Sequence, residues 1–207
     1  MKSRLALGCA ALLVFECVGA AWATNGGPEL TEVLGWDPAE GKVFFRTHYV
    51  DETDRPPGIF YLNLKGKDPS RLERVAWSRE DFPDSVYEGR VRRLERRLEP
   101  LELLTTPTIP LYPRILRGDT LNAYGDRWPR YRVRVEDPEI LPGTLEVTTL
   151  CDPGVLVIRQ YQVPGRRELI GIASFRGIPW EMCYEAQVPF LVPQEGERRV
   201  IEWRHDR

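Results

Sequence analysis

The residues that could carry catalysis in this chain are few. Its two histidines are His48 and His205, whereas a hydrolase triad requires a nucleophile, a base and an orienting group. Ser174 lies between Ala173 and Phe175, without the flanking glycines of a nucleophile elbow. The sequence therefore disfavours a Ser-His-Asp enzyme.

Metal and cofactor motifs give little more. There is no C-x-x-C pair, no H-E-x-x-H helix motif and no glycine-rich phosphate loop after an expected strand. Asp51, Glu52 and Asp54 offer the oxygen ligands that Ca²⁺ prefers, but Pro56-Pro57-Gly58 follows them directly. Because proline and glycine at this spacing are typical of a turn, we favour a polar turn and predict neither a metal nor a cofactor.

Two acids on one expected strand face are the remaining catalytic candidates. Glu181 and Glu185 point to the same side because side chains alternate along a strand. Paired carboxylates can hydrolyse glycosidic bonds when their separation and pKa values suit the reaction. A solvated strand face is the more common use of such positions. An exported, carboxylate-dependent hydrolase acting on polysaccharide is therefore the alternative function.

The elements that would position these residues are mostly strands. Residues 155–163 and 169–175 are rich in β-branched side chains, and Pro164-Gly165 between them suits a type II turn. From Trp180 to Val188 apolar residues alternate with polar ones, which indicates one buried and one solvated face. We expect three antiparallel strands joined by short turns.

The composition is that of a globular protein, with 42% hydrophobic and 29% charged residues among 207. Residues 42–50 and 59–64 are expected to pair as a hairpin, and antiparallel strands are expected across residues 130–203. The predicted fold is mainly β (α+β). Its antiparallel sheets either pack as a sandwich or stand as two small sheets, with one amphipathic helix near residues 85–98.

Residues 85–98 carry the expected helix. Asp84 or Ser85 can cap it, Ser85 and Glu88 fit a capping box, and Pro100 should end it. Its apolar stripe consists of Tyr87, Val91, Leu94, Leu98 and Leu101. Its basic residues are Arg90, Arg92, Arg93, Arg96 and Arg97. We interpret these arginines as a solvated face balanced by nearby glutamates; a patch for an anionic partner is the alternative.

A repeat-like pattern lies nearer the N-terminus. It consists of Trp36-Asp37-Pro38, Gly41–Phe45, Ile59–Gly66 and Arg71-Leu72. Over residues 34–72 the pattern resembles one blade of the TolB-type (WD40-like) propeller repeat, which implies a blade-like sheet. A propeller needs several blades, and no second copy follows here. The resemblance therefore does not extend to that family's peptide-binding channel.

The first 23 residues are typical of a secretory signal peptide. Lys2 and Arg4 form a basic start, residues 5–18 are mostly apolar, and Ala21-Trp22-Ala23 fits the small-x-small cleavage pattern. The apolar run is shorter than the ~20 residues that a membrane span requires. We therefore expect cleavage, no stable membrane span afterwards, and a single β-rich domain over residues 24–207 in the periplasm or outside the cell.

Cys151 and Cys183 remain after the expected cleavage, and a disulfide between them suits an oxidising compartment. It would close a loop of about thirty residues. Two buried thiols are the alternative, because Cys151 alternates with Leu145 and Val147 whereas Cys183 lies among glutamates, so that the two side chains would point to different faces.

The favoured function is that of an exported, non-enzymatic protein that binds a partner or supports the cell envelope. The formal net charge of −2 gives no global reason to expect nucleic acid or an acidic membrane as the partner. A further alternative is an accessory subunit that docks its proline-rich, apolar segment Leu101–Pro113 onto another protein. That alternative predicts an exposed apolar patch around the segment.

Overall fold

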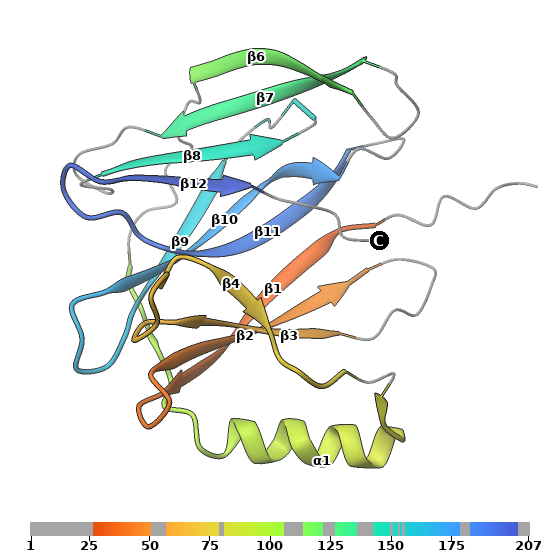
Figure 1. The fold of residues 1–207 in the computed structure, drawn as a ribbon, viewed down its shortest axis with the longest axis vertical. Helices are drawn as coiled ribbons and strands as arrows, with labels where there is room; N and C mark the ends of the chain where they lie inside the picture. Colours follow the sequence, from red (N-terminus) through yellow and green to blue (C-terminus); the bar gives the residue numbers. More distant parts are fainter. Residues whose placement is uncertain are drawn as a thin grey trace, which may run out of the picture.

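The computed structural model describes residues 27–50, 57–78, 81–105, 114–121, 127–135, 143–149, 151–152, 154, 156–178 and 183–202. Within these residues the chain forms twelve strands and one α-helix, so the prediction of a mainly β fold with a single helix is confirmed. The strands make an eight-stranded sheet and a four-stranded sheet (Figure 1).

The strand order in each sheet defines the architecture. The large sheet runs β4 (Leu72–Arg74), β3 (Gly58–Asn63), β2 (Lys42–Tyr49), β1 (Glu29–Asp37), β11 (Tyr184–Leu191), β10 (Leu169–Ile178), β9 (Val157–Gln162) and β5 (Glu102–Leu103). The small sheet runs β12 (Arg198–Glu202), β8 (Thr144–Thr149), β7 (Arg127–Val135) and β6 (Arg114–Leu121).

The expected meander of β9, β10 and β11 is confirmed as consecutive antiparallel pairs. Gly165 has a φ of +68° in the turn between β9 and β10, which is the conformation that a glycine allows there. The expectation of purely antiparallel sheets is wrong at two places, because β1 runs parallel to β11 and β12 runs parallel to β8. The alternation within a strand sets its buried face but not the direction of a distant partner.

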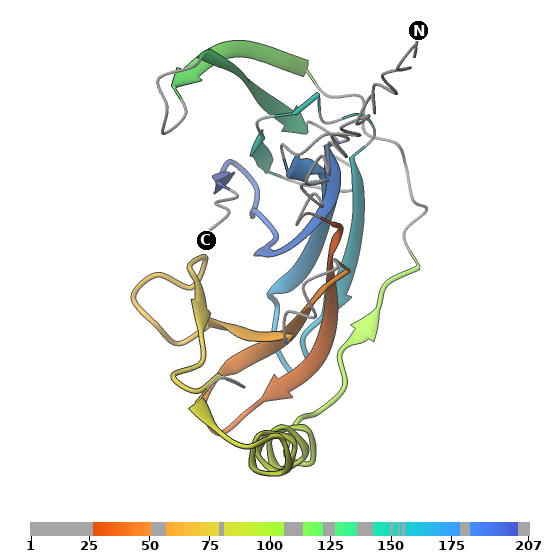
Figure 2. The ribbon, with the colours of Figure 1, turned by 90° about the vertical axis from the view of Figure 1, so that its right-hand side faces the viewer.

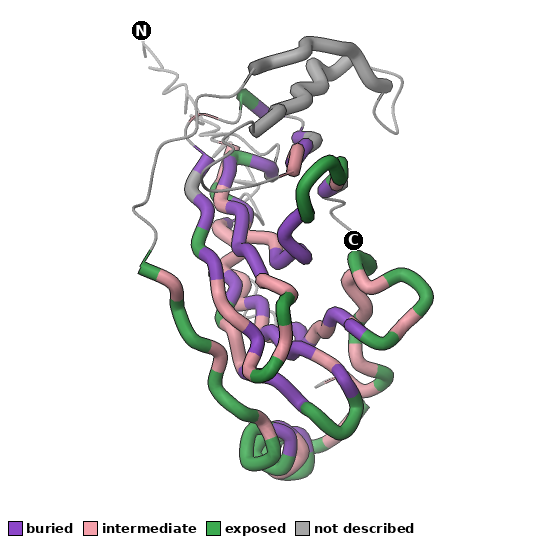
Figure 3. The backbone as a smooth tube through the Cα atoms, turned by 90° about the vertical axis from the view of Figure 1, so that its left-hand side faces the viewer, coloured by how far each residue is buried: buried purple, intermediate pink, exposed green. Residues whose placement is uncertain are grey.

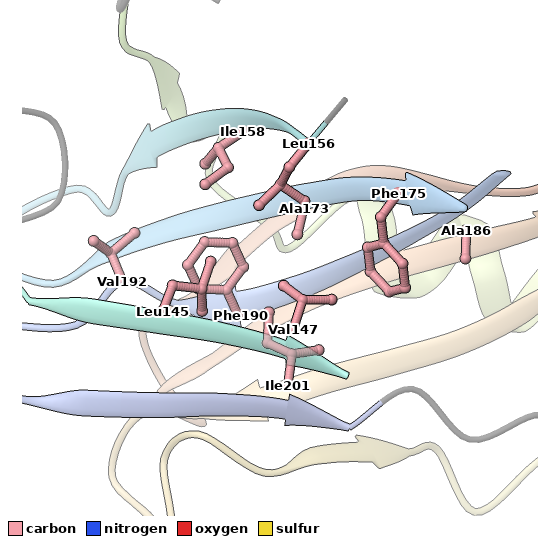
Figure 4. Packing of buried hydrophobic residues seen from close by; sticks show 10 residues of the cluster. All are labelled: Leu145, Val147, Leu156, Ile158, Ala173, Phe175, Ala186, Phe190, Val192 and Ile201. Carbon is pink, nitrogen blue, oxygen red and sulfur yellow. The ribbon is translucent and has the colours of Figure 1, made fainter. Parts of the chain in front are cut away.

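The small sheet packs against the β9–β11 part of the large sheet. Leu145 and Val147 of β8 point toward Phe175 and Phe190 of the large sheet, and all four side chains are buried (Figure 4). Each large apolar side chain removed from water in this way contributes about 1.5–3 kcal/mol. This face-to-face core corresponds to the sandwich, one of the two arrangements that the strand pattern left open.

Helix α1 (Asp84–Glu95) lies at one end of the molecule, across the β2–β3 part of the large sheet (Figures 1 and 2). Leu94 packs with Phe44 and Ile59, which confirms the core-facing side of the helix. The predicted cap is wrong: the N-cap residue is Pro83, and no side chain caps the helix. The Pro83 carbonyl instead accepts hydrogen bonds from the amides of the first turn.

The helix also ends earlier than expected, at Glu95 rather than at residue 98. Residues 99–104, which we call the strap, cross from β1 to β9. The amide of Trp36 donates to the Glu99 carbonyl and the amide of Glu99 donates to the Trp36 carbonyl, both at 2.8 Å. At the other end the Leu104 amide donates to the Gln160 carbonyl at 3.0 Å. Because Glu99 pairs with Trp36 in an extended conformation, the helix ends before Pro100.

Apolar side chains from both halves of the large sheet meet beside the strap. Trp36 of β1 shares a buried cluster with Ile170 and Ile172 of β10 and with Leu191 of β11, and Leu101 of the strap packs against that cluster. β1 and β11 are in register only at Glu29 and Ala186. The strap therefore supplies the backbone pairing that β11 does not give to the far end of β1.

Gly35 is the position in β1 on which the strap depends. It lies at a break in the register between β1 and β2, with φ of +146°, and a Cβ atom there would lie 2.8 Å from both the Glu99 carbonyl oxygen and the Leu98 Cβ. We predict that Gly35→Ala lowers the free energy of unfolding by about 1–3 kcal/mol, measured by urea denaturation.

Gly89→Ala in α1 is the matched control, because nothing lies within 4 Å of a Cβ atom at that position. It should raise stability by about 0.5–1 kcal/mol through helix propensity. Equal effects of the two substitutions would contradict the close approach of the strap to β1.

Candidate functional site

A row of polar side chains crosses the face of β9–β11 that points away from the small sheet. We call it the polar row, and it consists of Thr31, Arg159, Ser174, Glu185 and Gln187. The four residues on β9–β11 alternate with buried neighbours such as Ala173 and Ala186, which face the small sheet. The predicted solvated face of β11 is thereby confirmed for Glu185 and Gln187.

Gln187 connects the polar row. Its Oε1 accepts hydrogen bonds from the Thr31 amide at 3.1 Å and from Arg159 Nη2 at 2.8 Å. Its Nε2 donates to Glu185 Oε1 at 2.8 Å, and its backbone carbonyl accepts from Thr31 Oγ1 at 2.7 Å. The Gln187 side chain therefore takes part in joining β1 to β11, where backbone pairing is short.

Glu185 is the acid of this row. Ser174 Oγ donates to its Oε1 at 2.5 Å, and the Gln187 amide donates to the same oxygen. The hydroxyl of Ser174 is the largest of the influences that lower the pKa of Glu185; Gln187 adds to it, burial opposes it and the charge of Arg159 assists it. A general acid at neutral pH needs a raised pKa, so this carboxylate suits hydrogen bonding and not proton donation.

The second acid of the expected catalytic pair, Glu181, lies outside the described residues, as do Asp51, Glu52 and Asp54. Among the residues that the structure describes, no three His, Cys, Asp or Glu side chains gather in a way that could hold a metal ion. The segment expected to dock onto a partner is described only to residue 105, where β5 leaves Leu103 exposed.

His48 belongs to a different cluster, on the helix-facing side of β1 and β2. Its Nε2 lies 2.9 Å from Glu32 Oε2, and Arg46 Nη1 lies 3.3 Å from the same oxygen. Arg46 also pairs with Glu95 at the end of α1. Arg46 thereby ties the sheet to the helix, and His48 contacts the same carboxylate that Arg46 pairs with.

Cys151 and Cys183 form a disulfide, with their Cα atoms 6.0 Å apart. Cys151 follows β8 and Cys183 precedes β11, so the bridge joins the two sheets covalently. The two cysteine side chains were expected to point to different faces of the sheet. Cys183 departs from the strand alternation, because its backbone has a φ of +49° just before β11 begins. In the chain-entropy account, closing a loop of this length stabilises the fold by about 3–4 kcal/mol.

An ion pair between a buried carboxylate and an exposed guanidinium in the small sheet had no counterpart among the expected contacts. Glu146 is fully buried, although its neighbours Leu145 and Val147 face the other side of β8. Arg198 of β12 donates to both carboxylate oxygens, at 2.7 and 2.6 Å. Both hydrogen bonds come from Arg198 Nη2, and this charge-assisted contact stabilises the parallel pairing of β8 and β12.

The polar row could be anticipated only in part. The alternation around Glu185 and Gln187 predicted their shared face, and Ser174 lies one strand away. The sequence did not predict Thr31 or Arg159 as members of the polar row. Thr31 is 156 residues from Gln187 along the chain, and no local pattern indicates a parallel neighbour.

None of the known protein families, curated proteins or solved structures compared with this chain matches it. Residues 29–74 form four antiparallel strands in sequence order, β1 to β4, which continue into β11. The resemblance to a TolB-type blade stays a prediction. In the part of the chain that the structure describes, no helix has the length and apolar character needed to span a membrane.

The pKa of Glu185 offers a direct test of the polar row. Ser174→Ala removes the hydroxyl that contributes most to the lowered pKa, so we predict that the pKa of Glu185 rises toward its ordinary value. Carbon NMR titration of the side-chain carboxyl groups measures this. A carboxyl group whose pKa is lower in the folded than in the unfolded state stabilises the fold at pH values above the unfolded pKa. The variant should therefore be less stable than the wild type at neutral pH. This difference in stability should vanish as the pH falls through the folded pKa of the wild type.

Ser70→Ala is the control substitution. The Ser70 hydroxyl lowers the pKa of Asp68 in the same way, at a site on the loop after β3. That variant should raise the pKa of Asp68 and leave Glu185 unchanged. A Glu185 pKa that does not respond to Ser174→Ala would show that the two side chains are not bonded in solution.

Proposed function

We propose that this chain is an exported, non-enzymatic protein of the cell envelope that binds a partner. The observation that carries the proposal is the disulfide between the two sheets. Disulfides of this structural kind persist in oxidising compartments outside the cytoplasm, which agrees with the expected signal peptide at residues 1–23.

The binding part of the proposal is supported by the contacts of the acidic side chains, which hold the strands and the helix together. Glu185 accepts hydrogen bonds from Ser174 and Gln187, while Glu32 is held between Arg46 and His48. These groups are committed to joining strands and to holding the helix. The result is a stable scaffold whose faces carry hydrogen-bonding and charged side chains, as recognition of a partner requires.

The hydrolase alternative receives less support. It needs one carboxyl group with a raised pKa beside one that stays ionised. The pKa of Glu185 is lowered, with the Ser174 hydroxyl as the first cause. Glu185 could therefore serve only as the ionised partner, and the acid would have to come from elsewhere.

Expression of the full chain with its leader in a bacterial host tests the proposal. We predict that intact-mass measurement of the exported fraction finds a protein beginning at Thr24, with Cys151 and Cys183 joined and no reactive thiol before reduction. Retention in the cytoplasm with Met1 in place would contradict export.

Incubation of the same purified protein with a panel of polysaccharides tests the non-enzymatic part separately. We expect no release of reducing ends. Hydrolysis that is lost in Glu185→Gln but kept in Glu195→Gln, an exposed acid away from the polar row, would favour the hydrolase instead.

A further inference from the structure

The side of α1 that faces away from the sheet is strongly basic. Tyr87, Val91 and Leu94 are buried, whereas Arg92, Arg93 and Arg96 are exposed. The helix has both buried and exposed positions along its backbone (Figure 3). Because residues three and four apart share a helix face, these arginines surround Gly89. They line a shallow, open hollow of about 570 Å³ together with Gly89 and Glu95.

Gly89 has no packing role that would explain it. A Cβ atom there would meet nothing within 4 Å, and glycine inside a helix is less stable than alanine. A larger residue at this position would project between the arginines and fill the hollow. The glycine therefore lowers helix stability while leaving a basic recess open.

The arginines of the recess are not neutralised in the described part of the chain. Glu95 is paired with Arg46 on the sheet side, and the neighbouring Arg97 is paired with Asp37 and Glu40. Arg93 and Arg96 donate their Nε–H groups to the helix carbonyls of Gly89 and Arg92, at 3.2 and 3.3 Å. These bonds restrain the two side chains and leave their terminal N–H groups for a ligand.

We propose that the recess over Gly89 binds a phosphate group. Guanidinium groups donate pairs of parallel hydrogen bonds to phosphate oxygens, and three of them converge here around a position without a side chain. The phosphate belongs either to a free phosphate-bearing small molecule or to the headgroup of an anionic lipid. The proposal deepens the binding role proposed above by naming its site and the chemistry of its partner.

Binding of the intact mature protein to three probes tests this site and distinguishes the sources. The probes are inorganic phosphate, vesicles of phosphatidylglycerol and vesicles of phosphatidylcholine, measured by calorimetric titration and by co-sedimentation at low salt. Binding to inorganic phosphate alone identifies a small-molecule site. Binding to phosphatidylglycerol but not to phosphatidylcholine identifies the lipid headgroup, and either result supports the proposal.

Gly89→Leu is the decisive variant, because it fills the recess, favours the helix and leaves the net charge unchanged. We expect it to weaken binding at least about fivefold, and Arg92→Ala, Arg93→Ala or Arg96→Ala to weaken it about fivefold each. Arg167→Ala is the matched control: Arg167 is exposed in the turn between β9 and β10, and its loss changes the charge equally. It should change binding less than about twofold.

The proposal is overturned if neither inorganic phosphate nor phosphatidylglycerol vesicles bind, or if Gly89→Leu binds like the wild type. It is also overturned if Arg167→Ala weakens binding as much as the recess variants, since surface charge alone would then explain the affinity. Circular dichroism confirms that each variant is folded. Failure here would leave export and the lack of hydrolysis untouched, because leader cleavage and the polysaccharide assay test those separately.

Discussion

The short contact between β1 and β11 is the constraint on which the rest of the molecule depends. The two strands are in register only at Glu29 and Ala186, so most of β1 has no strand partner on that side. Polar groups of a buried backbone must find partners. The side chain of Gln187 meets this need near the register pair, and Glu99 of the strap meets it at Trp36. The Gln187 side chain and the strap thus add to the single register pair and to the apolar cluster around Trp36 in joining β1 to the β9–β11 strands.

The position of the helix follows from the same constraint. The strap begins four residues after α1 ends, so its pairing with β1 fixes the end of the helix. Arg46 pairs with Glu95, and Arg97 pairs with Glu40 and the buried Asp37, whose Oδ2 lies 3.0 Å from Arg97 Nε without hydrogen-bond alignment. The acids nearest the sheet, Glu95, Glu40 and Asp37, are therefore paired with arginines that do not belong to the recess. The outward side of the helix keeps its positive charge, which is the basis of the proposed phosphate recess.

Local patterns predicted the local structure of this chain well. Alternation around Ala186 identified the buried face of β11, the glycine turn identified the β9–β10 hairpin, and the spacing of Val91 and Leu94 identified the core side of α1. The strap, the parallel pairings and the buried Glu146–Arg198 contact could not be predicted, because each joins segments far apart in the chain. The predicted cap at Ser85 was wrong for a related reason. A capping motif shows only that a side chain is able to cap a helix, whereas the contacts of the surrounding chain determine where the helix begins.

The strap links the far end of β1 to the outer edge of β9 through backbone hydrogen bonds at both of its ends. Hydrogen exchange of the backbone amides of Trp36, Glu99 and Leu104 in the intact protein measures this link most directly. Each of these amides donates a hydrogen bond between the strap and either β1 or β9. We predict protection comparable to that of the amides paired between β2 and β3. Exchange of these three amides at the rate of an unstructured peptide, while β2 and β3 stay protected, would contradict it.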